Sequence, residues 1–201
     1  MCVRIPACVT LIGLIGLLPT TRSLGAEGHQ PPAIDAKAME KMMKEFAAMV
    51  PEHARFKEMV GTWKAETKDF FANPAQPTVS EGKAVFKLLM GGRYIEQHFQ
   101  CQMSGEMFEG MGITGYDKSK KKYVSIWIDN MGTGIMQTEG VHDEATNTTT
   151  EVGESDSPMG KMKMKTVAKG LTPDKYLFTM YILGDSGSEQ KCMEILYTRM
   201  P

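Results

Sequence analysis

The stretch FEGMGITGYDKSKKKYVSIWIDNMGTGI, residues 108–135, contains two strand-like runs, each followed by a polar turn. The runs cover 108–116 and 122–128, and they are rich in β-branched and aromatic residues. Runs of this length between short polar turns are typical of antiparallel hairpins. The lysine-rich segment 118–122 therefore fits a solvated hairpin loop.

The same pattern extends through the rest of the chain after Gly61. Turn-forming residues such as Gly, Asn, Asp and Pro separate the runs, and no helical pattern lies between them. We predict ten strands, at 62–70, 80–89, 93–102, 108–116, 122–128, 134–142, 148–154, 161–171, 175–183 and 191–199. The fold class is therefore all-β. A ten-stranded antiparallel up-and-down β-barrel of lipocalin-like form is favoured because closure removes the sheet edges. A β-sandwich is the alternative.

The chain begins differently. Residues 1–26 combine Arg4, a short apolar run and a small-residue end, which is typical of a secretory signal. The apolar run is shorter than the ~20 residues that span a bilayer. We expect cleavage near Ala26, a periplasmic or secreted protein, and no membrane attachment afterwards. Residues 27–50 then form a tail and an N-terminal helix. The barrel domain covers 51–201, and a second short helix begins at Pro51.

Composition argues against several function classes. The chain has 23 basic and 24 acidic residues, so we expect no nucleic-acid partner. Its four histidines show no zinc-binding spacing, and it lacks a phosphate loop and a nucleophile elbow. We therefore expect no metal and no cofactor. Cys101 and Cys192 are predicted to face opposite ways, Cys192 outward, so we do not expect a disulfide.

The two ends of the barrel predict how it closes. The first strand opens with Gly61-Thr62-Trp63, and the last strand ends at Arg199. Closure places these strands side by side, so the guanidinium can lie across the indole in a cation–π contact. If Trp63 and Arg199 point inward, alternation also turns Phe86 and Tyr197 inward. We assign Gly61, Trp63 and Arg199 a structural role.

Strand 122–128 holds the most pocket-like residues. Trp127 and the nearby Asp129 could supply an aromatic wall and a polar anchor at the barrel mouth. A core tryptophan and a turn aspartate explain the same residues, and alternation does not decide which face lines the interior. The ligand pocket that we expect is lined by Phe86, His98, Tyr116, Trp127, Asp129 and Tyr197.

Two alternatives to simple binding remain. An enzyme could use Glu96 with His98, which share a strand face, as an acid–base pair, although a solvated polar face explains them equally well. It could instead use Asp129 beside Trp127. The second alternative is Cu(I) binding by methionine, since thioethers are suitable ligands for this ion. Its candidates are Met103, Met107 and Met111, spaced by four, and Met162 with Met164.

Several motifs resemble one known family. FEGMGITGYD, YVSIWIDNMGTGI, GVHD and MEILYTR, together with GTW and MGGRY, look like the domain of unknown function 1579 family. The resemblance covers residues 51–199 and implies a lipocalin-like β-barrel, with no established reaction or ligand. The neighbouring nitrobindins bind haem through a histidine in their C-terminal part, whereas no histidine follows His142 here. The ten hairpin-linked strands with inward apolar alternation, and a possible helical lid before Gly61, lead us to expect an exported barrel that binds a small apolar or amphipathic ligand.

Overall fold

The structure is a computed structural model that describes residues 35–103, 105–157 and 160–201. The expected signal segment, 1–26, lies outside the described residues. The chain divides into two units, 1–46 and 47–201. Helix α1 (Ala36–Ala47) lies within the segment 27–50, for which a tail and an N-terminal helix were predicted, and all of its residues are exposed. No described helix is both long enough and apolar enough to cross a membrane.

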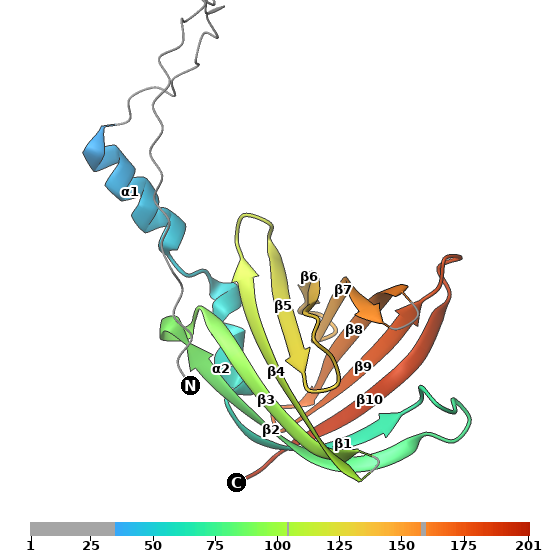
Figure 1. Ribbon diagram of the computed structural model, residues 1–201. Helices are drawn as coiled ribbons and strands as arrows, with labels where there is room; N and C mark the ends of the chain where they lie inside the picture. The colour runs from blue at the N-terminus through green and yellow to red at the C-terminus, as the bar shows by residue number, and fades with distance from the viewer. Residues whose placement is uncertain (1–34, 104, 158–159) are drawn as a thin grey trace, which may run out of the picture. The chain divides into compact units, whose positions relative to one another are not determined.

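Ten antiparallel strands form one closed barrel, in which each strand pairs with the next and β1 pairs with β10 (Figure 1). The predicted barrel is thereby confirmed, and the β-sandwich is excluded. The strands are β1 (Gly61–Asp69), β2 (Thr78–Leu89), β3 (Tyr94–Met103), β4 (Glu106–Asp117), β5 (Lys122–Asp129), β6 (Met136–Asp143), β7 (Thr148–Ser157), β8 (Gly160–Thr172), β9 (Lys175–Leu183) and β10 (Glu189–Arg199).

A short helical segment covers one end of the barrel. It consists of a 3-10 turn, η1 (Pro51–Arg55), and one turn of α-helix, α2 (Phe56–Met59), and we call it the cap. The Tyr123 hydroxyl on β5 donates a hydrogen bond to the Glu52 carbonyl (3.1 Å). The Phe56 ring packs edge-on against the Tyr123 ring, with centroids 6.0 Å apart. Burial raises the pKa of Tyr123 to about 12, so its phenol stays a donor at neutral pH.

The cysteines differ from the prediction in one respect. Cys192 was expected to face outward, but it is 1% exposed. The register of β10 against β9 shifts between Lys191 and Met193, so Cys192 is the extra residue of a β-bulge. Its thiol donates to the Met180 carbonyl (3.3 Å). Simple alternation fails at a bulge, so it did not predict the burial of Cys192, which does not line the cavity. Cys101 is also buried, and both thiols are free.

Candidate ligand-binding cavity

The barrel encloses a cavity of about 1360 Å³. Ligand pockets usually measure about 300–1,000 Å³, so this cavity is large. All ten strands contribute inward-facing side chains to it, and the cap contributes Arg55, Phe56, Glu58 and Met59. The interior of the barrel is therefore not filled by its own side chains.

One wall of the cavity is aromatic. It comes from β1, β2, β3, β9 and β10, and its buried rings are Trp63, Phe86, Phe99, Tyr176 and Tyr197. The Tyr176 and Tyr197 rings stack with centroids 4.3 Å apart and an interplanar angle of 12°. Burial raises the pKa of both tyrosines, so they remain neutral. This wall offers a broad apolar surface with few polar atoms.

The opposite wall carries a chain of hydrogen-bonded polar groups on four consecutive strands. The Thr114 and Ser125 hydroxyls, on β4 and β5, lie 2.9 Å apart. Ser125 also donates to Glu151 Oε1 on β7 (3.0 Å). Thr138, on β6, donates to Glu151 Oε2 (2.6 Å). Glu151 is 8% exposed, and its burial raises the pKa of its carboxyl above the ordinary value.

Methionines supply much of the remaining lining. Those that line the cavity are Met59, Met103, Met131, Met136, Met162, Met164, Met180 and Met193. Methionine is flexible and polarizable, so such a surface adapts to apolar ligands of different shapes.

The Cu(I) alternative had two sets of candidates, and the structure separates the first, Met103, Met107 and Met111. Met103 lines the cavity, whereas Met107 is 52% exposed. Met111 lies opposite His98 in the β3–β4 register, on the outer face. Met162 and Met164, the second set, both line the cavity. For ligands other than methionine, no group of three or more His, Cys, Asp or Glu side chains among the described residues could hold a metal ion.

Trp63 and Arg199 meet beside the cap. They are register partners in the β1–β10 pair, and the guanidinium lies 4.1 Å from the centroid of the indole. Arg199 Nη1 also donates to the Val60 carbonyl (2.7 Å), and its Nε pairs with Asp174 Oδ1 (2.9 Å). Gly61 opens β1 opposite Phe86. These contacts tie the closing strands to the segment that follows the cap.

Trp127 and Asp129 both line the cavity, and they contact each other. The indole N–H donates to Asp129 Oδ2 (2.9 Å), and Asp129 Oδ1 accepts from the Met131 amide (3.0 Å). The indole lies directly over β4, where a Cβ at Gly110 would sit 2.2 Å from Trp127 Cζ2. Gly110, within the stretch 108–135, thus makes room for the Trp127 ring. Asp129 serves as both a turn residue and a partner of the indole.

Phe86 and Tyr197 also line the cavity, but two of the expected pocket residues do not. His98 projects from the outer face of β3, 47% exposed, with its Nε2 3.2 Å from Glu96 Oε1. Residues with the opposite parity, such as Phe99, face inward, and this corrects the expected placement of His98. Tyr116 packs beneath the cap, where its ring contacts His53 and Tyr123.

Glu151, the central polar group of the cavity, was not among the pocket residues expected from the sequence. Strand β7 reads TTTEVGESDS, and its polar residues occupy both faces. Alternation therefore could not show which face is buried. The strand register would have shown the inner face of β7. Glu151 lies opposite Gly140 on β6 and opposite the inward-facing Thr166 on β8.

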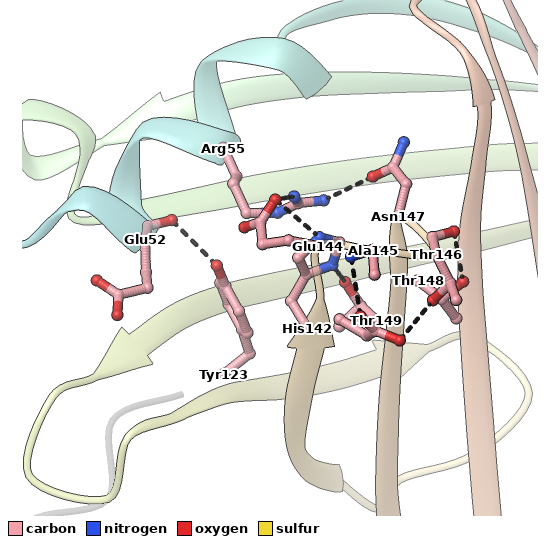
Figure 2. Close-up of polar contacts among 11 residues, drawn as sticks. Glu52, Arg55, Tyr123, His142, Glu144, Ala145, Thr146, Asn147, Thr148 and Thr149 are labelled. Atoms are coloured by element: carbon pink, nitrogen blue, oxygen red, sulfur yellow. Dashed lines mark hydrogen bonds and ion pairs between the residues drawn. The ribbon is translucent and has the colours of Figure 1, made fainter.

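A second polar cluster joins the cap to the β6–β7 hairpin (Figure 2). His142 Nδ1 lies 3.0 Å from Thr149 Oγ1, and its Nε2 lies 3.6 Å from Glu144 Oε2. Arg55 pairs with Glu144 (3.5 Å) and donates to Asn147 Oδ1 (3.3 Å). Figure 2 shows Arg55 reaching from the cap towards the hairpin residues. The His142 side chain is 3% exposed.

His142 is expected to make stability depend on pH. Burial, reinforced by Arg55, lowers its pKa below 6.5, so the folded state binds this proton less readily than the unfolded state. The contribution is fully present above pH 6.5 and is lost as pH falls through the lowered pKa. Urea unfolding at pH 7.5 and 5.5 should therefore show a stability loss that His142→Gln reduces. An equal loss in both proteins would contradict this role.

Comparisons with known proteins agree with the fold. The family described as "Protein of unknown function (DUF1579)" matches residues 49–199. The crystal structure of Rv2717c from M. tuberculosis aligns with a TM-score of 0.56 at 10% identity, covering 77% of this chain and 100% of that one. The S-type phycobiliprotein lyase CPES from Guillardia theta aligns at 0.49 and 12% identity, covering 79% and 97%. No curated protein matches the sequence.

Proposed function

The chain belongs to the DUF1579 family, whose function is unknown, and we propose that it binds a small apolar or amphipathic molecule inside its barrel. The size and lining of the cavity carry this proposal. A space of about 1360 Å³ lies between an aromatic wall and a methionine-rich lining. A barrel that served only as a scaffold would gain stability by filling such a space, because empty volume forfeits packing contacts.

The energetics favour an apolar ligand. Each Å² of apolar surface removed from water contributes about 25 cal/mol, so burying roughly 300 Å² of ligand surface gains about 7.5 kcal/mol before the costs of association. Flexible methionines adapt to the ligand at little cost in strain. The polar groups around Glu151 would then fix the orientation of the ligand rather than supply most of the affinity.

The enzyme alternative gains no support from the geometry. Glu96 and His98 contact each other on the outer face of the barrel, away from the cavity. Inside, the Asp129 carboxylate already accepts hydrogen bonds from Trp127 and the Met131 amide. Ligand binding is therefore the function that the described residues support best.

A titration with the neutral apolar dye N-phenyl-1-naphthylamine tests the proposal. The dye fluoresces strongly only in an apolar environment, so saturable enhancement with one dye per chain is expected. Native mass spectrometry of the purified protein should also show any co-purified small molecule that occupies the cavity. The absence of saturable dye binding would count against a ligand-accessible cavity.

A further inference from the structure

Glu151 is a buried carboxyl group without a cationic partner. It is 8% exposed and lines the cavity, and none of the ion pairs among the described residues includes it. The hydroxyls of Ser125 and Thr138 are its two hydrogen-bond donors. Burial of a carboxylate is costly unless the group is paired, so a functional explanation is needed for its retention at this position.

The hydrogen bonds leave part of the carboxyl group available to the cavity. An ionised carboxylate offers about four acceptor positions, and the two hydroxyls use one on each oxygen. The strands on either side of β7 place Thr138 and Thr166 next to Glu151, and neither side chain can neutralise it. A ligand that approaches through the cavity therefore meets an acceptor with unfilled positions.

The basic side chains of the lining, Arg55, Lys175 and Arg199, lie at the cap end of the cavity. The acidic Glu58 and Asp174 lie at the same end, and Arg55 and Arg199 are already paired with acidic residues. Asp69 and Asp129 lie at the far ends of β1 and β5, which start beside the cap. The end of the cavity away from the cap is thus acidic, and it favours the approach of cations over anions.

We propose that the ligand is an amphiphile with a protonated amine, and that Glu151 binds this amine while the aromatic wall holds the apolar body. An ammonium group has three donors and no acceptor, which matches the unfilled positions on the carboxylate. The inference rests on the proposed function, since it names the chemical class of ligand for the same cavity.

The burial of Glu151 also predicts a stability cost in the empty barrel, which agrees with this assignment. Because burial raises the pKa of Glu151, the group stabilises the fold only in acid, and this contribution is lost as pH rises through the raised pKa. At pH 7 the empty protein therefore carries a cost that Glu151→Gln removes. A residue that lowers stability while facing a cavity is typical of a binding site.

Three twelve-carbon probes test the proposal: dodecylamine, dodecanol and dodecanoate, each titrated calorimetrically at pH 7 below its aggregation concentration. The amine should bind about tenfold or more tightly than the alcohol, and dodecanoate should bind most weakly. Glu151→Gln should reduce the affinity for the amine to near that of the alcohol, leave dodecanol within about threefold, and raise the thermal midpoint of the empty protein.

Glu154→Gln is the matched control. Glu154 lies on the same strand but is exposed, and its replacement changes the net charge by the same amount. It should leave all three affinities unchanged. If the two variants had equal effects, or if the amine and dodecanoate bound equally well, the amine assignment would be overturned. Binding of the dye and of dodecanol would in that case still support the proposed function. Failure of the dye and all three probes to bind would overturn both.

Discussion

Trp63→Ala lowers the free energy of unfolding by about 3–5 kcal/mol, as expected for the loss of a large buried aromatic side chain. Trp63 is 2% exposed, and its ring packs edge-on against Tyr176 with centroids 5.2 Å apart. Its indole N–H donates to the Met59 carbonyl in the cap (2.8 Å), and Arg199 lies over its face. The side chain therefore contacts the cap, the β1–β10 pair that closes the barrel, and the aromatic wall, and its removal weakens all three.

Urea unfolding followed by circular dichroism measures this effect. Trp63→Phe is the matched variant, because it keeps an aromatic ring but loses the N–H donor to Met59. It should cost clearly less than Trp63→Ala. A loss of unfolding free energy below about 1 kcal/mol for Trp63→Ala would show that closure of the barrel by β1 and β10 does not depend on this residue.

Gly140→Ala should destabilise the barrel by about 1–3 kcal/mol or more, because the added methyl group collides with backbone. A Cβ at Gly140 would lie 1.8 Å from the Thr150 carbonyl oxygen on β7. A backbone oxygen cannot relieve the clash by a rotamer change, as a side chain could, so β6 and β7 would have to move apart. Glu151 sits opposite Gly140 in the register, and the distortion would therefore also reach the polar wall.

Gly134→Ala provides the control for this prediction. Gly134 lies in the loop between β5 and β6, and a Cβ there would meet nothing within 4 Å. Its replacement should change stability by less than about 0.5 kcal/mol. The comparison uses the difference in urea midpoint between the two variants. If both midpoints fell equally, the close approach at Gly140 would not limit the packing of β6 against β7.

The architecture followed from the sequence because local signals were strong. Turn residues separated every strand-like run, and ten runs with no helical pattern between them left closure as the way to satisfy the sheet edges. The structure places Trp63 beside Arg199, where this closure requires them to lie. The opening stretch, 108–135, became the β4–β5 hairpin and the loop after it.

The site was harder to predict because a strand with polar residues on both faces does not show its inner face. His98 was taken as a pocket residue, yet its neighbour Phe99 is the one that faces inward. Glu151 was missed for the same reason. The burial of Cys192 was not predicted because a bulge interrupts alternation, and nothing in the local sequence marks that bulge. Which carboxylate is buried therefore depends on the register of distant strands.

Binding of a ligand within the barrel is tested most directly by a variant that fills the cavity. Thr166 on β8 is buried and lines the cavity, whereas Val167 points to the other face of the same strand. Thr166→Phe should weaken the affinity for N-phenyl-1-naphthylamine by about tenfold or more, and Val167→Phe should leave it unchanged. Equal dye affinity in both variants, with both folded by circular dichroism, would contradict binding inside the barrel.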